Sequence, residues 1–424
     1  MKSKKKIVCF GPGPMFKGGI ANYNTSLAKA FDKIDNTEVH IVSWTQQYPA
    51  IIPRDFIDRK SKVDQLEGTN INVHYITNYN NPLSWKATVK LIKSLKPDKV
   101  IFQWAIAIQG IPLGFIAKKL KHDADIEVFF DLHFVIQKEG SALDNSLTKL
   151  GIKNADSYIV HAFKTAEELK QLFPRKKFEI IKKGDSISGD RIKVLKLYHP
   201  VYDMFKPNSN FDKVKTKKEM GLKENVFLFF GFIRKYKGLH NVIEAFNVIS
   251  NKRDDVSLII CGESFWNTLD NKKLSTRIKN ATFGLAKKLF LKNQDNEQDY
   301  NPLALIKDYK LDNLVFLNNE FVPNEEVPKY FQVSDNIMLF YLTATPSGVE
   351  SIGYNFNMPM LATNVGHFPE TVINGYNGYM AEANDIDSMV EAMNKSIESP
   401  IDRKNVAATS KDMSWANYAN EILR

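Results

Sequence analysis

The chain has 424 residues, of which 43% are apolar and 25% are charged, and these fractions exclude a disordered or fibrous chain. No run approaches the roughly 18 uncharged apolar residues of a membrane span, and the apolar run behind the basic amino terminus, at 7–10, is too short for a signal peptide. The 58 lysines and arginines outnumber the 48 acidic residues, and the formal charge of +10 would attract phosphates, nucleotides, anionic lipid surfaces or nucleic acid without choosing among them.

The first half of the chain alternates short β-branched or aromatic runs with segments whose apolar residues have helical spacing. The predicted strands are 6–10, 39–44, 71–76, 99–104, 126–133 and 157–161. The helical segment behind the first strand places Ile20, Tyr23 and Leu27 on one face. Strands that are apolar throughout and are joined by helices indicate a parallel sheet covered on both faces, so we predict a Rossmann-like α/β domain.

The same alternation restarts after a polar, lysine-rich linker at 200–224. Further strands are predicted at 226–231, 256–262, 314–317, 336–341 and 359–363. At roughly 100 to 200 residues per domain the length also favours two domains. We predict a first domain at 1–203 and a second doubly wound domain at 204–409, with a cleft between them. The helical segment at about 410–424 carries Trp415 and Tyr418, which need a packing surface, and we expect it to return to the first domain.

A basic segment at about 264–300 interrupts the strand rhythm of the second domain. Leu274, Ile278 and Leu285 recur there at helical spacing among lysines and arginines. One interpretation is an inserted helical hairpin that caps the second domain. The other is an amphipathic helix that lies on an anionic membrane surface.

The two cysteines, Cys9 and Cys261, each sit inside an apolar run that reads as a buried strand, which makes them small core residues. Together with the missing signal peptide, this favours a cytoplasmic protein. No His, Cys and Asp spacing makes a metal site, and no Gly-x-Ser-x-Gly nucleophile signature occurs. Nucleic-acid binding is disfavoured, because no basic patch carries interleaved aromatic residues.

Three glycine-containing turns follow predicted strands, at the edge where an open α/β sheet binds its ligands. The first turn, at 11–19, ends in Gly18 and Gly19, which would let a phosphate or sugar approach the backbone at a helix amino terminus. It lacks the Gly-x-Gly-x-x-Gly spacing of a dinucleotide site, so NAD is disfavoured. A tight turn without a ligand is the alternative.

The second turn, at 231–238, carries the cations Arg234, Lys235 and Lys237 at the mouth of the sheet. These cations suit a diphosphate, because arginine offers a fork of donors and lysine a point charge. A solvated basic loop is the alternative.

The third turn, at 343–348, lies between a strand and a helical segment. Thr345 or Ser347 is placed to cap that helix, while the free amides of the cap, including that of Gly348, face a phosphate. A bare helix cap would need no ligand.

His133 ends a strand at the carboxyl edge of the first sheet, where it could hydrogen-bond a sugar hydroxyl or a phosphate. His161 and His199 also close strands. A structural role remains an alternative for all three.

In combination, these motifs resemble the group 1, or family four, glycosyltransferases. The resemblance covers nearly the whole chain in order. It rests on Gly18-Gly19, His133, Tyr-His-Pro-Val-Tyr at 198–202, Phe-Gly-Phe-Ile-Arg-Lys-Tyr-Lys-Gly-Leu at 230–239, Cys-Gly-Glu-Ser-Phe-Trp at 261–266, Thr-Pro-Ser-Gly-Val at 345–349, Pro-Met-Leu-Ala-Thr-Asn-Val-Gly at 359–366 and Pro369-Glu370.

The resemblance implies a GT-B fold, in which two Rossmann-like domains face across a cleft and the last helix crosses back to the first domain. The first domain would bind a glycan or lipid-linked acceptor, and the second a nucleotide-diphosphate sugar, linked to UDP or GDP, as donor. Arg234 and Lys237 would hold the diphosphate, Gly19 would face it, and His133 would lie near the transferred sugar. Transfer of a hexosyl-type group would retain the anomeric configuration and would need neither metal nor other cofactor.

The chain departs from the family at its usual pair of glutamates, whose positions, counted back from Pro359, hold Ala344 and Ile352. Glu350 lies close by, and its reaching the ribose is a hypothesis, with the backbone amides of Ser347 and Gly348 as substitutes. A catalytically inactive binding or scaffold protein, or another GT-B enzyme such as an epimerase or phosphorylase, remains an alternative.

The basic character of the first domain and of the segment at 264–300 suits a lipid-diphosphate acceptor at the inner face of a membrane. We therefore expect surface-polysaccharide or lipopolysaccharide synthesis, by a peripheral protein.

Overall fold

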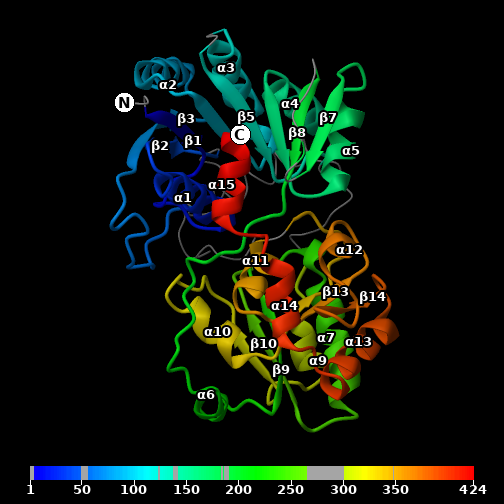
Figure 1. Ribbon diagram of the computed structural model, residues 1–424. Helices are drawn as coiled ribbons and strands as arrows, with labels where there is room; N and C mark the ends of the chain where they lie inside the picture. Colours follow the sequence, from blue (N-terminus) through cyan, green and yellow to red (C-terminus); the bar gives the residue numbers. More distant parts are fainter. Residues whose placement is uncertain are drawn as a thin grey trace, which may run out of the picture.

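The computed structural model describes residues 4–48, 56–122, 125–136, 142–182, 185, 191–264, 300–346 and 348–424. Within these ranges the chain forms two α/β domains, which Figure 1 shows one above the other. Ser347, and all of the basic segment at 264–300 except its two end residues, lie outside the described residues. No helix in the described ranges combines the length and the apolar character needed to cross a bilayer.

The described strands of the first domain form an eight-stranded parallel sheet with the order β3-β2-β1-β4-β5-β6-β8-β7. They are β1 (Lys5–Phe10), β2 (Thr37–Gln46), β3 (Asn72–Asn78), β4 (Lys99–Trp104), β5 (Glu127–Leu132), β6 (Ser157–Val160), β7 (Phe178–Lys182) and β8 (Ile192–Lys196). The helices are α1 (Gly19–Asp32), α2 (Pro82–Leu95), η1 (Ala107–Gln109), α3 (Gly110–Leu120), α4 (Ala142–Ile152) and α5 (Phe163–Leu172). The strand order reverses between β1 and β4, so a crevice opens at their carboxyl ends.

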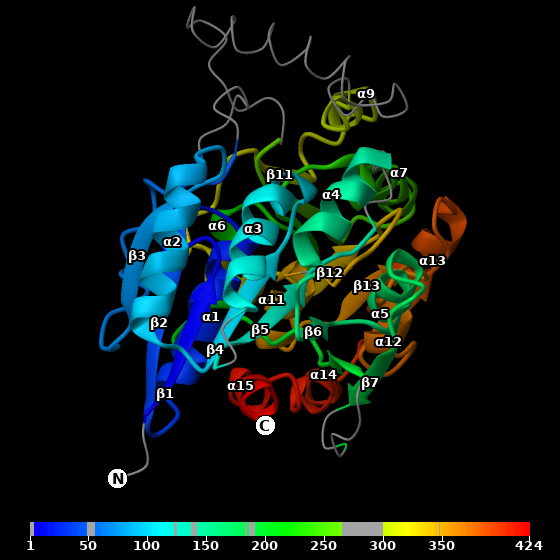
Figure 2. The ribbon, with the colours of Figure 1, turned by 90° about the horizontal axis from the view of Figure 1, so that it is seen from above.

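Alternate residues of β1 pack on opposite faces of this sheet, as the period of two in a strand requires. Ile7 and Cys9 belong to the core under α1, whereas Val8 and Phe10 belong to the core under α2 and α3. Figure 2 shows α2, α3 and α4 on one side of the sheet and α15 (Trp415–Leu423) on the other. Cys9 and Cys261 are buried and free, and burial raises the pKa of both thiols.

The described strands of the second domain form a six-stranded parallel sheet with the order β11-β10-β9-β12-β13-β14. They are β9 (Asn225–Phe230), β10 (Val256–Cys261), β11 (Val315–Asn318), β12 (Asn336–Leu339), β13 (Met360–Thr363) and β14 (Gly378–Ala381). The helices are η2 (Lys235–Lys237), α7 (Leu239–Ser250), α9 (Ala304–Asp308), α10 (Val327–Val333), α11 (Gly348–Asn355), α12 (Phe368–Thr371), α13 (Ile386–Glu398) and α14 (Arg403–Ser410). Helix α6 (Lys213–Glu219) precedes this domain.

Two neighbouring segments connect the domains. The N–H of Val201, in the first connection, donates to the carbonyl of Met413, in the second, at 2.8 Å. The second connection leads into α15, which packs against α1 in the first domain (Figure 1). Trp415 and Tyr418 are both buried there. The last helix therefore belongs, by packing, to the first domain.

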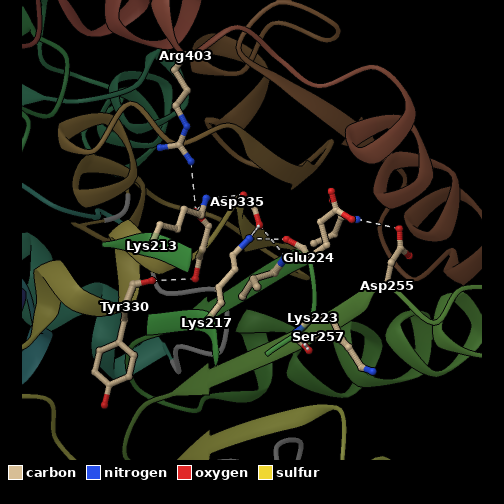
Figure 3. Close-up of polar contacts among 12 residues, drawn as sticks. Lys213, Lys217, Lys223, Glu224, Asp255, Ser257, Tyr330, Asp335 and Arg403 are labelled. Atoms are coloured by element: carbon tan, nitrogen blue, oxygen red, sulfur yellow. Dashed lines mark hydrogen bonds and ion pairs between the residues drawn. The ribbon is translucent and has the colours of Figure 1, made fainter. Parts of the chain in front are cut away.

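Helix α6 is fastened to the second sheet by one carboxylate, that of Asp335 (Figure 3). Its two oxygens accept from the ammonium groups of Lys213 at 2.5 Å and of Lys217 at 2.9 Å, and from the N–H of Val226 at 2.9 Å. Burial alone would raise the pKa of Asp335, but Lys213 and Lys217 hold it below its usual value. This cluster lies at the amino ends of β9 and β12, so it supports the fold rather than the cleft.

Candidate active site

A cavity of about 300 Å³ lies between the two domains, at the carboxyl ends of their strands. Its lining includes Gly18, Gly19, Asn22, Tyr202, Phe205, Gly231, Phe232, Tyr236, Lys237, Gly262, Glu263, Phe321, Tyr341, Thr345, Pro346 and Gly348. The predicted glycine turns therefore meet in one space.

A larger surface depression, of about 510 Å³, lies at the opposite edge of the first sheet, beside the carboxyl end of the chain. Two ion pairs occupy its lining, one between Lys99 and Glu127 and one between Lys121 and Asp156 at 2.8 Å. Because open α/β sheets bind ligands at the carboxyl ends of their strands, we assign the site to the smaller cavity.

The first turn delivers the amino terminus of α1 to the cavity. Gly18 caps this helix with φ of 98°, a conformation that side-chain-bearing residues rarely adopt, and no side chain caps the free amides. The carbonyl of Gly19 accepts a hydrogen bond at 2.8 Å from the hydroxyl of Tyr202, which fixes the turn against the interdomain connection. The amides of the first helical turn are suited to an anion.

The second turn buries the ammonium group of Lys237, whose residue is only 6% exposed. No hydrogen bond or ion pair joins this ammonium to another described residue, and the ring of Tyr341 lies 5.8 Å from it. Burial, with a further contribution from Arg234, lowers the pKa of Lys237 to about 7. Arg234 is half-buried beside Tyr236, 5.8 Å from its ring, and is not among the residues that line the cavity. Lys237 is thus the cation that lines the described cavity, and Arg234 lies outside this lining.

The third turn places Thr345 and Gly348 in the cavity wall, while Ser347 lies outside the described residues. Gly348 begins α11 against Tyr202, because a side chain at 348 would come within 2.8 Å of the Tyr202 ring. Close packing therefore requires glycine at this helix start.

Glu350 is buried behind the cavity wall. Its two carboxylate oxygens accept from the Thr371 hydroxyl at 2.5 Å and contact Nε2 of His367. Glu350 does not line the cavity, and a contact with ribose would require it to leave these partners. Its role toward a ribose stays a prediction.

His133 follows β5 at the carboxyl edge of the first sheet. Its Nε2 lies 2.8 Å from Oε1 of Gln103, and its backbone N–H donates to the backbone carbonyl of Trp104 at 3.1 Å. The edge of its ring meets the ring of Tyr23, with centroids 4.7 Å apart. Burial lowers the pKa of His133 to about 4, although the nearby charge of Asp131 opposes the effect. His133 is therefore a neutral imidazole.

The other two strand-ending histidines have different partners. Nε2 of His161 lies 2.9 Å from Oδ1 of the fully buried Asp131, whose Oδ2 accepts from the hydroxyls of Tyr23 at 2.9 Å and Tyr418 at 3.0 Å. Nδ1 of His199 lies 2.6 Å from the Ser351 hydroxyl, across the domain boundary. These contacts give His161 and His199 packing roles.

Sequence reasoning missed three components of this site. Tyr202 bridges two turns, and the rings of Phe232 and Phe321 line the cavity. Tyr202 and Phe232 belong to the sequence motifs at 198–202 and 230–239, but only the fold shows which residues of these motifs line the cavity. In the described part of the chain, no group of three or more histidine, cysteine or acidic side chains is arranged to hold a metal ion.

Residues 210–413 match the family model described as group 1 glycosyl transferases. Over 229 residues the chain is 22% identical to the capsular polysaccharide biosynthesis glycosyltransferase CapM of Staphylococcus aureus, in an alignment that covers 52% of this chain and 49% of CapM. The chain thus spans about half the length of this curated relative.

The whole fold resembles two solved structures. HepE of Anabaena, in complex with UDP and glucose, superposes with a TM-score of 0.66 and 15% identity over 99% of this chain and 98% of that one. Sucrose-phosphate synthase of Thermosynechococcus elongatus gives a TM-score of 0.63 and 13% identity over 99% and 97%. At such identities the likeness shows the fold alone. Together with the two parallel sheets and the returning last helix, these matches show that the chain has the GT-B fold and that its residues 210–413 match the group 1 glycosyl transferases.

Proposed function

We propose that this chain is a glycosyltransferase that moves a sugar from a nucleotide-diphosphate sugar to a glycan or lipid-linked acceptor. The observation that carries the proposal is the buried Lys237 ammonium in a cavity where the amino termini of α1 and α11 also meet. A cation and free helix amides together suit a diphosphate. The complex of HepE with UDP and the capsular-polysaccharide role in the name of CapM support the same reading.

The chemistry of the proposed site is electrostatic. As the bond from the sugar carbon to the diphosphate breaks, the diphosphate gains negative charge, which Lys237, Arg234 and the amides behind Gly18 and Gly348 would stabilise. The acceptor hydroxyl would attack from the same face and pass its proton to the departing diphosphate, so the anomeric configuration would be retained. Since these groups would stabilise the negative charge on the departing diphosphate, the proposal assigns no metal ion to this step.

The acceptor belongs to the first domain in this proposal. The net positive charge of the chain fits an anionic, lipid-diphosphate acceptor at the inner face of a membrane, as in polysaccharide or lipopolysaccharide synthesis. Liposomes that contain anionic lipid should then retain the protein at low salt, and failure of retention would contradict the membrane part alone.

The donor site is tested by calorimetric titration of UDP, GDP, ADP and CMP into the wild type and the Lys237→Ala variant. We expect one nucleoside diphosphate to bind and the variant to weaken it by at least about tenfold, because a charge-assisted contact inside the cavity is lost. Lys235→Ala is the matched control, since Lys235 belongs to the same short helix but does not line the cavity. Equal losses in the two variants would mean that only general charge attraction was measured.

Turnover is tested with the sugar derivatives of the nucleotide that binds. Release of that nucleotide together with an enlarged acceptor, with its new linkage examined by NMR, would establish transfer and its stereochemistry. Tight binding without any product would favour a scaffold protein instead.

A further inference from the structure

The hydrogen bond between His133 and Gln103 determines which ring nitrogen of His133 carries the proton, although neither residue is among those that line the cavity. Oε1 of Gln103 is an acceptor only, so the 2.8 Å contact requires the proton on Nε2 of His133. The ring is neutral at physiological pH, because burial lowers its pKa to about 4, and it therefore carries a single proton. Nδ1 is then left with a lone pair, and no hydrogen bond joins it to another described residue.

Gln103 is placed beside His133 by its strand, and its own Nε2 has no hydrogen-bond partner among the described residues. It lies at the end of β4, where it pairs in register with Asp131 of β5, two residues before His133. Alternate residues of a strand share a face, so Gln103, Asp131 and His133 point to the same side of the sheet. The Gln103 residue is only 3% exposed.

Gly11 makes the space that the Gln103 side chain needs. A Cβ atom at position 11 would come within 2.8 Å of Cγ of Gln103 and 3.1 Å of Cγ of Asn24. The first glycine turn, predicted as a ligand loop, thus has a second effect, because it allows a glutamine to stand beside the histidine.

The other two histidines of the cluster lack this arrangement. His161 faces a carboxylate, and Nδ1 of His199 lies near the Ser351 hydroxyl and 2.9 Å from the backbone carbonyl of its neighbour Pro200, so neither is placed against a side-chain amide. An amide fixes the tautomer without adding a charge that would favour the imidazolium form.

We propose that Gln103 is a positioning residue that holds His133 with its proton on Nε2 and presents Nδ1 as a hydrogen-bond acceptor to a sugar hydroxyl. The part that concerns the sugar rests on the proposed function. A hydroxyl can donate to Nδ1, whereas an ionised phosphate offers acceptors alone. Between the two partners expected for His133, the geometry therefore selects a hydroxyl.

The tautomer is measured directly by NMR on protein labelled with ¹⁵N-histidine at about pH 8. His133 is assigned among the eight histidines by comparison with His133→Phe. We expect the wild type to show a protonated Nε2 and an unprotonated Nδ1. A protonated Nδ1 in the wild type would overturn the proposal, because the amide would then have to face the ring with its nitrogen.

Three variants separate positioning from simple packing. Gln103→Met keeps the bulk but removes the acceptor, so the share of His133 protonated on Nε2 should fall. Gln103→Glu restores an acceptor oxygen and should restore the proton on Nε2, while its negative charge should raise the pKa of His133. Gly11→Ala should disturb the tautomer in the same direction as Gln103→Met, because its Cβ displaces Gln103.

Gln109→Met is the matched control. Gln109 is also a buried glutamine of the first domain, with one hydrogen bond from its Nε2 to the carbonyl of Gln47 at 3.1 Å. Its substitution should lower stability by a similar amount and leave the His133 tautomer unchanged. A change of tautomer in this control as large as in Gln103→Met would assign the effect to loosened packing and overturn the proposal.

Calorimetry with UDP and UDP-glucose adds a readout on the sugar. In Gln103→Met, the affinity for UDP-glucose relative to that for UDP should fall by about tenfold, the usual effect of one lost hydrogen bond, while the UDP affinity stays constant. An unchanged ratio, with both ligands bound, would overturn the hydroxyl contact. If neither ligand binds the wild type, the UDP-linked form of the proposed function fails, and the NMR result still decides the role of Gln103.

Discussion

If the cavity binds UDP-glucose, as the UDP-linked form of the proposed function expects, changing the pH across the neutral range should change this affinity through the charge on Lys237. The pKa of this buried ammonium is lowered to about 7 in the empty site. A bound diphosphate places negative charge beside it and raises that pKa, so binding takes up a proton whenever Lys237 is neutral beforehand. The affinity is therefore greatest well below pH 7 and declines as the pH rises through 7.

The size of the effect follows from the fraction of protein that carries the charge. About half of the Lys237 side chains are protonated at pH 7 and about 3% at pH 8.5, so the apparent affinity should fall by about 15-fold between these values. UDP-glucose is the appropriate probe, because its diphosphate is esterified at both ends and does not titrate in this range.

The assay is calorimetric titration at several pH values, in two buffers whose heats of ionisation differ. The heat difference between buffers should correspond to an uptake of about half a proton at pH 7. Lys237→Arg serves as the control, because a guanidinium stays charged throughout and should flatten the pH profile. A flat profile in the wild type, without proton uptake, would refute the argument that burial of Lys237 makes it titrate.

Three further predictions concern the glycine turn, the α6 anchor and the last helix. Gly231→Ala should abolish measurable UDP binding, because its Cβ would lie 2.8 Å from the Lys237 ammonium and the backbone there has a φ of 92°. Gly375→Ala is the control, since Gly375 has a similar φ but no atom within 4 Å of the added Cβ, and it should leave UDP binding intact. Asp335→Asn should lower the free energy of unfolding, measured in urea at pH 7, by about 1–3 kcal/mol, because two lysines lose their carboxylate partner. Asp254→Asn is the control, since Asp254 is exposed, and it should change the free energy of unfolding little. Because the pKa of Asp335 is depressed, this difference should be present above the ordinary carboxyl range and vanish as the pH falls through the folded-state pKa; a difference that persists in acid would contradict the ion-pair explanation. Tyr418→Phe should destabilise the protein by about 1–3 kcal/mol, since the buried carboxylate of Asp131 loses a donor. This loss of stability should be larger than that in Tyr379→Phe, because the Tyr379 hydroxyl donates to a neutral carbonyl at 2.7 Å. Equal losses in the two variants would refute the role given to Asp131.

Sequence patterns identified the central strands of each sheet and also the edge strands β3 and β11, whereas the strands that they missed, β7, β8 and β14, lie toward the other edge of each sheet. β7 and β8 carry lysines between their apolar residues and are only partly buried. β14 has four residues and begins with a glycine. Strand patterns are weakest where one face is exposed or the run is short, so the missed strands are those for which tertiary pairing supplies the stability.

From the sequence, the positions of the three glycine turns at the strand ends could be predicted, but not the contacts of the side chains around them. The three glycine turns follow parallel strands, so their meeting at one edge follows from the topology. The partners of individual side chains do not follow. Gln103 precedes His133 by 30 positions, and Glu350 contacts His367 from another helix. These pairings depend on strand register and on helix packing, which no local pattern encodes.

The interdomain contacts are unequal on the two sides of the cavity. Beside the connections, the core continues from one domain to the other through buried side chains such as Tyr202 and Trp415. On the opposite side, the contacts include a 3.4 Å hydrogen bond between the Asn22 and Asn324 side chains. They also include an ion pair between Lys60 and Glu320, whose side chains are 47% and 72% exposed. Exposed ion pairs contribute about 0–1 kcal/mol, far less than a continuous apolar core. Separation of the domains should therefore begin at this rim and pivot on the connections, which opens the cavity to a nucleotide while Tyr202 keeps its hold on Gly19.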